Sequence, residues 1–337
     1  MSAFQWNHQS FMELSRNFWT LRAVQAAVEL GLFTALDKGE GGKTTVGDLA
    51  KTLGADGRGL GMLVTALTAL GLLVRDDQGV GLTPEAARYL SENSGEYYGH
   101  ALIHQANIMP AWLGLAEAVK TGQRVTKASA AESGSDKTRE DFLMAMYNNA
   151  RYQAATVAKA LDLGSRNSLL DLGGGPGTYA IEFCLQNPNL SAVIFDLPGS
   201  EPVAKKIMAK MGVADRVKFV AGDYNQDPLP KPFDAVFISQ VIHQESPQGA
   251  AALVAKAAGV LEKGGFLAIQ DLYVDNDLTG PVTPALFSLN MLVNTIGGQA
   301  YTFAQVEDLM KKAGLSDIGL ASAKLPPGCA IMMGIKA

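Results

Sequence analysis

One stretch of the sequence combines an acidic residue with a run of glycines, a pattern suited to holding a small ligand. Apolar residues after Ser168 lead into Asp171, and glycines follow at positions 173, 174, 175 and 177. Glycine lets a backbone turn with positive φ or lie directly against a ligand. A helical pattern then begins at Tyr179, and the N-terminus of a helix offers free N–H groups and a partial positive charge. The stretch predicts a strand, a tight turn and a helix start that bind a ligand carrying a carboxylate.

The spacing of the glycines separates several kinds of ligand. A dinucleotide fold requires G-x-G-x-x-G, but counting from Gly173 puts Thr178 in the place of the last glycine. The Gly-Lys-Ser/Thr of a phosphate loop is also missing. An acid before the glycines would repel a pyrophosphate, whereas it suits an ammonium group. S-adenosylmethionine carries an ammonium, a sulfonium, a ribose and an adenine, and we expect it to be held by Asp171, Gly173, Gly175 and Gly177.

Acids also follow the next two predicted strands. Asp196 and Leu197 come at the end of one strand, and Gly222, Asp223 and Tyr224 come at the end of the next. Ligands of open α/β sheets bind at the carboxyl ends of the strands. Asp196 can accept hydrogen bonds from both ribose hydroxyls, Asp223 can accept one from the adenine amino group, and Tyr224 can stack on the adenine. A single such acid can equally be a helix cap, but three at successive strand ends favour a cofactor site.

A histidine follows the fourth predicted strand. His243 comes shortly after the strand that ends at Ser239, and no other histidine occurs in this half of the chain. Histidine is a natural base for removing a proton from a hydroxyl. The sequence therefore predicts a catalytic base at the ligand edge of the sheet, with a structural histidine as the alternative.

Composition limits the class of protein. The chain has 337 residues, enough for two domains of ~100–200 residues each. Its net charge of −5 argues against a nucleic-acid surface, which needs basic patches. Cys184 and Cys329 lie in apolar runs and suggest no disulfide framework. Because we find neither a signal-peptide pattern nor an apolar run of ~20 residues, we expect a cytoplasmic protein that does not contact a membrane.

The first part of the chain is predicted to be mainly helical. Residues 10–37 repeat apolar residues every three or four positions, and this wide apolar surface needs cover from its own domain or from a partner subunit. A helix over 56–73 precedes a hairpin over 74–82, and Thr83 with Pro84 starts another helix. This is a winged-helix layout. Its second helix has only one basic residue, so we expect no DNA binding.

Two further helices, over 97–120 and 141–161, precede an alternation of strands and helices that predicts a parallel sheet. His100 and His104 share one helix face, but no third ligand is evident, so no metal site is predicted. A structural role and a substrate-pocket role both stay open for them. The acceptor is expected to enter between the domains, although such positions are often plain core. Candidate lining residues are His104, Asn107, Met109, Tyr147, Met291 and Asn294.

Taken together, these motifs resemble the dimeric, S-adenosylmethionine-dependent O-methyltransferases typified by plant caffeic acid and acetylserotonin methyltransferases and their bacterial antibiotic-pathway relatives. The resemblance covers nearly the whole chain. Its specific marks occur in the family's order and at family-like spacing. They are the Phe-Asp-Leu-Pro of residues 195–198, Gly222-Asp223, His243, and the Leu-Glu-Lys-Gly-Gly of residues 261–265.

The resemblance implies an α/β fold with a Rossmann-like methyltransferase domain. Its sheet would have seven mostly parallel strands with an antiparallel final strand, and a helical, winged-helix dimerisation domain would precede it. Residues 1–95 would form the dimerisation domain, 96–162 linking helices that line the substrate cleft, and 163–337 the cofactor-binding domain. The expected partners are a small-molecule acceptor and a second copy bound through the N-terminal helices, with no nucleic acid and no membrane.

The resemblance also implies roles for individual residues. His243 matches the catalytic base, and Asp271 occupies a place where the family often has a glutamate that orients this base. Ser239 stands where plant members often have a lysine near the methionine end of the cofactor, and with Gln240 it is expected to contact the cofactor. Asp196 matches the ribose ligand, and Asp223 matches the adenine-side ligand.

Some positions depart from the family pattern. Gln244 and Glu245 replace the usual Asp-Trp, and Ala300 replaces a second glutamate. The resemblance implies methyl transfer to a hydroxyl of a small aromatic or quinone-like molecule, with His243 as the base and S-adenosylhomocysteine as a product. Methylation of carbon or nitrogen on the same fold, or cofactor binding without transfer, are the alternatives.

Overall fold

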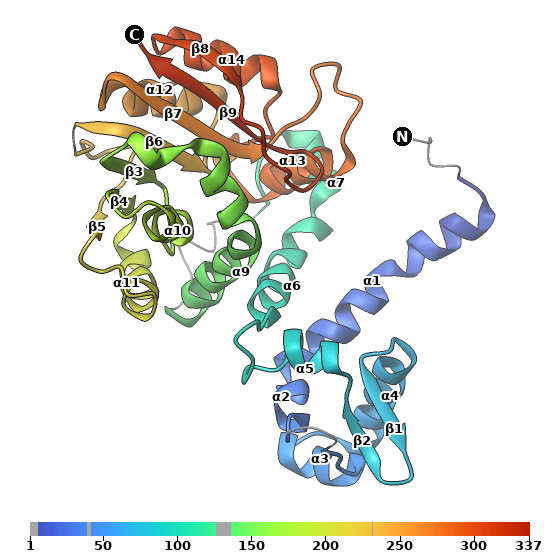
Figure 1. The fold of residues 1–337 in the computed structure, drawn as a ribbon. Coiled ribbons are helices and arrows are strands. Elements are labelled where there is room, and N and C mark those ends of the chain that lie inside the picture. Colours follow the sequence, from blue (N-terminus) through green and yellow to red (C-terminus); the bar gives the residue numbers. More distant parts are fainter. Residues whose placement is uncertain (1–5, 39–41, 126–135, 231) are drawn as a thin grey trace. The chain divides into compact units, whose positions relative to one another are not determined.

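The computed structural model describes residues 6–38, 42–125, 136–230 and 232–337. The chain forms two compact units, residues 1–107 and residues 108–337, and each is described by itself (Figure 1). The predicted boundaries after residues 95 and 162 stay predictions.

The first unit begins with two helices where the apolar pattern predicts one. They are α1 (His8–Glu29) and α2 (Leu32–Leu36). Gly31 separates them with a φ of 68°, a left-handed conformation that glycine adopts without steric cost. The prediction of one continuous helix over 10–37 was wrong for this reason.

The rest of this unit has the predicted winged-helix layout. Helices α3 (Val46–Leu53) and α4 (Gly57–Ala69) lead to the antiparallel hairpin of β1 (Leu73–Asp76) and β2 (Gly79–Leu82). Helix α5 (Pro84–Leu90) follows, and the Thr83 side chain caps it as predicted. The core of the unit is apolar and fully buried at Phe33, Val64, Leu67 and Val80, among others.

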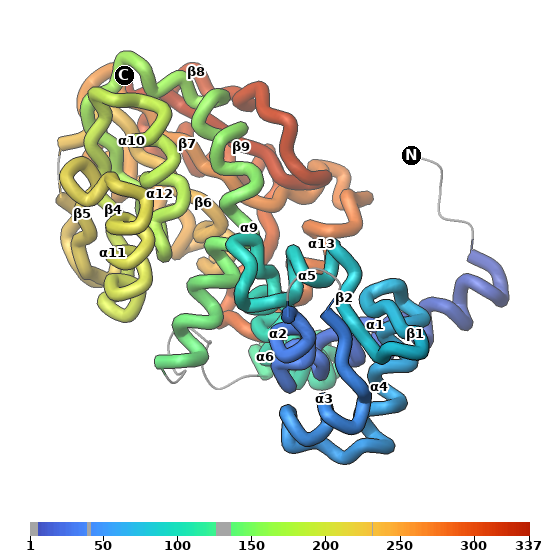
Figure 2. Tube along the Cα trace, turned by 60° about the horizontal axis from the view of Figure 1, so that its bottom comes forward, coloured from blue at the N-terminus to red at the C-terminus, as the bar shows by residue number. Residues whose placement is uncertain are grey.

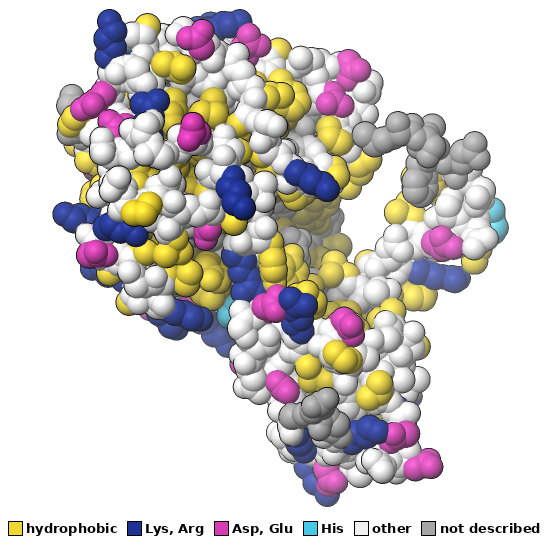
Figure 3. All heavy atoms as spheres, viewed as in Figure 1, with side chains coloured by type: hydrophobic (Ala, Val, Ile, Leu, Met, Phe, Trp, Pro, Cys, Tyr) yellow, Lys and Arg dark blue, Asp and Glu magenta, His cyan; other side chains and the backbone are white. Residues whose placement is uncertain are grey.

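Helix α1 leaves most of its length uncovered. Only Gln25, Ala27 and Val28 of this helix are buried, and its first turns project beyond the rest of the unit (Figure 2). Hydrophobic side chains are visible along this helix (Figure 3). Those between one third and three fifths exposed include Phe11, Leu14, Phe18, Trp19 and Leu21. An apolar surface of this size on a helix marks an interaction site.

Between α5 and the sheet, the described residues form further helices. Instead of one helix over 97–120 there are two, α6 (Gly99–Leu113) and α7 (Leu115–Thr121), which Gly114 separates. Helix α9 (Asp136–Leu161) begins five residues before the predicted start at Asp141. These differences move helix ends but not the order of the elements.

The second unit contains a seven-stranded sheet in the order β5-β4-β3-β6-β7-β9-β8. All neighbouring strands pair in parallel except the final strand, β9, which runs antiparallel to both β7 and β8. This confirms the predicted fold class. The strands are β3 (Ser168–Leu172), β4 (Ser191–Asp196), β5 (Val217–Ala221), β6 (Phe233–Ser239), β7 (Leu261–Leu272), β8 (Leu315–Leu320) and β9 (Cys329–Lys336).

Helices cover both faces of this sheet (Figure 1). Helices α9, α10 (Thr178–Gln186) and α11 (Glu201–Lys210) pack on one face, while α12 (Pro247–Gly259) and α14 (Phe303–Lys312) pack on the other. Alternate residues of each strand point to opposite faces, so Leu169 joins the first core layer and Leu170 the second. Helix α13 (Val282–Asn294) and three short 3-10 turns complete the unit: η1 (Leu163–Ser165), η2 (Pro198–Ser200) and η3 (Ile242–Gln244).

The strand order changes direction at β3, which creates a switch point at the carboxyl edge of the sheet. Strand β3 lies between β4 and β6, so the chain passes to one side after β3 and returns to the other side for β6. Ligands of open α/β sheets bind at such a switch point. The glycine turn follows β3 and His243 follows β6, so the topology puts both at this edge.

Candidate active site

The glycine turn packs tightly against the segment that follows β6. Gly173, Gly175 and Gly177 have φ values of 72°, 53° and 77°, which non-glycine residues rarely adopt. A Cβ atom on Gly173 would lie 2.6 Å from a methyl carbon of Val241, so a larger residue would push the two segments apart. The turn and the segment that carries His243 are therefore in direct contact.

Asp171, at the start of the turn, is a buried acid with an unused acceptor. Its side chain is 1% exposed, and its Oδ2 accepts one hydrogen bond from the Ala180 backbone N–H at 3.3 Å. Its Oδ1 is buried and has no hydrogen-bond partner among the described residues. Burial, opposed by the Ala180 hydrogen bond and reinforced by the nearby charge of Asp196, raises the pKa of Asp171 to about 7. An ammonium group would supply the missing donor and the opposite charge, so this residue fits the predicted cofactor.

Asp196, at the end of β4, is held in one orientation by three donors. Its Oδ2 accepts from the Gly175 N–H at 2.8 Å, and its Oδ1 accepts from the Leu197 N–H at 2.8 Å and the Ser200 hydroxyl at 2.7 Å. Burial raises its pKa, while these hydrogen bonds act in the opposite direction. A carboxylate has about four lone-pair positions, so capacity remains for a ribose hydroxyl.

The segment after β5 carries the predicted adenine-side residues. Asp223 accepts hydrogen bonds from the Asn225 N–H and from the Gln226 side chain, both at 2.8 Å. The Tyr224 hydroxyl donates to Glu245 Oε1 at 2.8 Å. Both side chains are thus fixed by partners within the same edge of the sheet.

The end of β6 is conformationally unusual. Gln240 has a φ of 58°, a left-handed conformation that is uncommon outside glycine, and its N–H donates to the Gln270 carbonyl at 2.9 Å. The Ser239 hydroxyl donates to the Gln270 side chain at 3.4 Å. Backbone strain of this kind gathers at functional sites because the surrounding structure must enforce it.

His243 and Asp271 form a buried hydrogen-bonded pair. The distance between His243 Nδ1 and Asp271 Oδ1 is 2.7 Å, and the two residues are 5% and 2% exposed. Asp271 Oδ1 also accepts from the Leu272 N–H at 2.7 Å. In the tautomer that donates its Nδ1–H to an Asp271 carboxylate, Nε2 of His243 keeps a lone pair. The Phe287 ring meets the imidazole edge-on, with the ring centroids 4.7 Å apart.

A glycine pair packs behind the histidine. A Cβ atom on Gly298 would lie 2.9 Å from the Gln244 carbonyl oxygen, 2.5 Å from the Thr295 hydroxyl, and closer still to the His243 carbonyl oxygen. The histidine backbone therefore occupies space that only glycine leaves free. No role for Gly298 was predicted from the sequence, although the two adjacent glycines at 297 and 298 were the available signal.

The predicted acceptor-lining residues are spread over both units. His104 and Asn107 belong to the first unit, and burial lowers the pKa of His104. In the second unit, Met109 is half-buried, Met291 is buried on α13, and the Asn294 side chain donates to Asn290 at 3.0 Å. Their contact with an acceptor stays a prediction.

Tyr147 lines a cavity of about 180 Å³ among α9, α10 and α11. Ile181 and Ile207, which also line it, belong to the core layer on one face of the sheet, whereas Ile242 beside His243 belongs to the other layer. The predicted contact of Tyr147 with the acceptor therefore has no geometric support within this unit, and it too stays a prediction.

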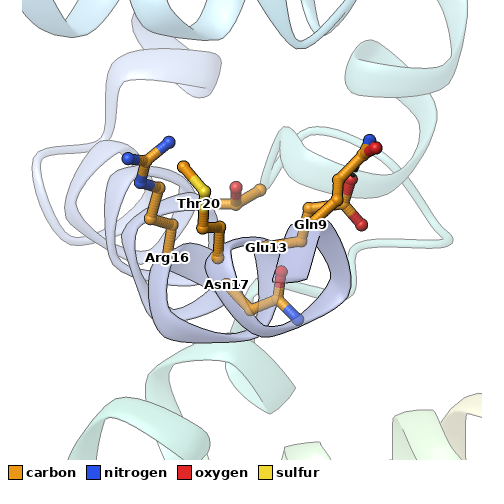
Figure 4. Close-up of a pocket in the computed structure, with 6 residues that line it drawn as sticks. Gln9, Glu13, Arg16, Asn17 and Thr20 are labelled. Atoms are coloured by element: carbon orange, nitrogen blue, oxygen red, sulfur yellow. Dashed lines mark hydrogen bonds between the residues drawn. The ribbon is translucent and has the colours of Figure 1, made fainter. Parts of the chain in front are cut away.

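A larger hollow of about 380 Å³ lies along the exposed part of α1 (Figure 4). Among the residues that the structure describes, helix α1 alone supplies the lining, and no second described element closes the hollow into a binding site. The lining residues are Gln9, Met12, Glu13, Arg16, Asn17 and Thr20.

The described residues contain no evident metal site. Among them, no three His, Cys, Asp or Glu side chains come together in a group that could hold a metal ion. Over the same residues, every helix is too short or too polar to cross a membrane.

Comparison with known proteins identifies the family. An O-methyltransferase domain matches residues 112–316, and an O-methyltransferase dimerisation domain matches residues 12–92. The chain belongs to the O-methyltransferase family. The protein is thus an enzyme of the S-adenosylmethionine-dependent O-methyltransferase class, which confirms the predicted family and cofactor.

Relatives in this family match the chain over nearly its whole length. The 3-hydroxy-5-methyl-1-naphthoate 3-O-methyltransferase of Streptomyces sahachiroi is 33% identical, over 96% of this chain and 94% of that protein. The tetracenomycin polyketide synthesis 8-O-methyl transferase of Streptomyces glaucescens is 31% identical, over 95% of both chains. The crystal structure of human N-acetylserotonin methyltransferase in complex with S-adenosylmethionine has a TM-score of 0.87 at 25% identity, and the match covers 100% of both chains.

Substitution of Gly298 tests the packing behind the histidine. In the Gly298→Ala variant the added methyl group overlaps the His243 carbonyl, so the imidazole must move and we expect methyl transfer to slow by at least tenfold. Gly259→Ala is the matched control, because Gly259 ends α12 and a Cβ there meets nothing within 4 Å. Equal rates for the Gly298 variant and the control in an S-adenosylhomocysteine-release assay would show that the packing does not position the base.

Asp171 predicts a pH dependence of stability in the ligand-free enzyme. Its pKa is raised from 3.8 to about 7, so between these pH values the folded state holds a proton that the unfolded state has released. The contribution of this proton to the free energy of unfolding is therefore lost as the pH rises from about 4 to 7. The non-titrating Asp171→Asn variant lacks this loss, which amounts to at most about 1.4 kcal/mol per pH unit. We expect Tm to fall more steeply with pH in the parent enzyme, and parallel Tm profiles would contradict the assignment.

Proposed function

We propose that this enzyme methylates a hydroxyl group of a small aromatic or quinone-like molecule, with His243 as the general base. The observation that carries the proposal is the buried 2.7 Å hydrogen bond between His243 and Asp271 at the switch point of the sheet. This pair lies beside the turn that carries Asp171, because Gly173 packs against Val241.

The reaction needs the His243–Asp271 pair because the acceptor hydroxyl carries a proton that must be removed. A hydroxyl oxygen that gains a methyl group must lose its hydrogen, and Nε2 of His243 has the lone pair to accept it. The resulting imidazolium is stabilised by the carboxylate of Asp271, which already holds the Nδ1 proton. A positioned base of this kind accelerates a reaction by typically ~10²–10⁴-fold.

The acids at the strand ends are assigned to binding of the cofactor. S-adenosylmethionine, when bound, supplies an activated methyl group. We assign Asp171 to its ammonium group, Asp196 to its ribose, and Asp223 and Tyr224 to its adenine. The remaining predicted contacts are Leu197, Gly222, Ser239 and Gln240. Fixed groups at one sheet edge hold the two reactants in line, and such alignment supplies ~7–11 kcal/mol of the barrier.

The relatives support the acceptor class. The relative from Streptomyces sahachiroi is named for 3-O-methylation of a hydroxynaphthoate, and the relative from Streptomyces glaucescens for 8-O-methylation in tetracenomycin polyketide synthesis, so both names specify transfer to an oxygen. Ala300, which stands where the family often has a second glutamate, keeps carbon or nitrogen methylation as the second candidate, since these reactions depend less on a base.

We further propose a homodimer that forms through α1 and its neighbours, in keeping with the dimerisation domain at residues 12–92. The cytoplasmic location stays a prediction from the sequence.

Removal of the base tests the proposed mechanism. We expect His243→Ala to lower the turnover number by ~10²–10⁴-fold, as loss of a general base requires, while S-adenosylhomocysteine binding by calorimetry stays intact. The turnover number of Asp271→Asn should lie between those of His243→Ala and the parent enzyme. Gln244→Ala, an exposed neighbour of the histidine, is the control. Full turnover by His243→Ala, or products methylated only on carbon or nitrogen across a panel of phenols, quinones and amines, would contradict the proposal.

Substitution of Phe18 tests the proposed dimer. Its side chain is 58% exposed on α1, and the Phe18→Glu variant places a charge on this apolar surface, so we expect monomers in sedimentation velocity. Leu320→Glu makes the same kind of change on β8, outside the dimerisation domain, where Leu320 is 59% exposed, and it should leave the dimer intact. A monomeric parent protein would rule out the dimer.

A further inference from the structure

We propose that Glu245 is a positioning residue that holds the ring of Tyr224 in the adenine site and links that site to the segment carrying His243. The inference rests on the proposed function, because it uses the assignment of Tyr224 to the adenine. It adds a residue that binds neither reactant but connects the two halves of the active site.

The side chain of Glu245 reaches across to the segment that follows β5. Its Oε1 accepts the Tyr224 hydroxyl at 2.8 Å and the Asn225 side-chain N–H at 3.3 Å. A hydrogen bond from a hydroxyl to a charged carboxylate is about twice as strong as one between neutral groups. Because the Tyr224 ring is half-buried and its hydroxyl is anchored, the plane of the ring is fixed before any ligand binds.

The backbone of Glu245 is tied to the catalytic segment. Its N–H donates to the Ile242 carbonyl at 3.1 Å, closing the short turn that contains His243. Its carbonyl accepts the Tyr301 hydroxyl at 2.7 Å, which connects the same turn to the start of α14. Glu245 thus holds the turn that contains His243 through its main chain, and it holds the ring of Tyr224 in the proposed adenine site through its side chain.

Glu245 is not needed as a helix cap, which is the usual role of a polar residue in this place. The neighbouring Ser246 performs that role, since its hydroxyl accepts from the Gly249 N–H at 3.2 Å at the start of α12. The carboxylate of Glu245 is therefore available for the contacts with Tyr224 and Asn225. Both burial and the charge of Glu245 raise the pKa of Tyr224, so its phenol keeps the proton that it donates.

The arrangement predicts how substitution divides between binding and turnover. Loss of the Glu245 side chain frees the Tyr224 ring but leaves His243 and Asp271 in contact. We expect Glu245→Ala to raise the KM for S-adenosylmethionine and the Kd for S-adenosylhomocysteine about tenfold, while kcat changes less than threefold. Glu245→Gln keeps an acceptor oxygen of the same shape and should restore most of the affinity.

A double-mutant cycle isolates the hydrogen bond itself. Tyr224→Phe removes the donor and keeps the ring, so it should reproduce the loss caused by Glu245→Ala, and the double variant should be no weaker than either single variant. Ser246→Ala is the control, because it removes the helix cap and lowers Tm without changing the Kd for S-adenosylhomocysteine.

The outcomes separate this inference from the proposed function. Unchanged affinity in Glu245→Ala, or additive losses in the double variant, would overturn the positioning role. If Glu245→Ala does not fold, the nearly isosteric Glu245→Gln and Tyr224→Phe variants decide: the inference holds if the first binds like the parent and the second binds weakly, and it fails otherwise. Asp196→Ala reports on the cofactor site as a whole, and unchanged affinity there would mean that the site itself is misassigned.

Discussion

The hydrogen bond between His243 and Asp271 is the contact on which the geometry of the site depends. Strands β6 and β7 pair in parallel with Ser239 opposite Gln270, so the next residues of both strands emerge at the same edge. The left-handed Gln240 then turns the chain, and the glycine pair at 297–298 leaves room for the histidine backbone. A buried imidazole and a buried carboxylate are each costly alone. Their contact offsets part of the cost of removing both from water, while Asp271 Oδ2 stays buried without a hydrogen-bond partner among the described residues.

A second electrostatic constraint lies at the ends of β3 and β4. Asp171 and Asp196 are two acids in one largely buried region, and burial raises the pKa of both. Asp196 is compensated by three donors, whereas Asp171 has one donor and an unused oxygen. Such a deficit is destabilising in the ligand-free enzyme and is relieved by a ligand with a positive charge. Under the proposed assignment of Asp171 to the ammonium group, the cofactor would neutralise this unfavourable group.

The sequence was sufficient for what depends on local pattern. Strand–helix alternation predicted the sheet, and Thr83 caps a helix as its side chain suggested. Features that depend on contacts between distant residues were not accessible. The Glu245–Tyr224 contact, for example, joins residues 21 positions apart. The setting of Tyr147, in a cavity among three helices, likewise needed the fold.

The most direct test of the account is the dependence of turnover on the acidity of the acceptor. Turnover of the parent enzyme and of His243→Ala would be measured with a series of naphthols of graded acidity. If His243 removes the proton, the parent rate depends weakly on acceptor acidity, while the variant recovers activity only with the most acidic naphthols and at high pH, where solvent has already ionised them. Parallel dependences in the two enzymes would contradict a general base at His243 and would reduce the buried pair to a structural role.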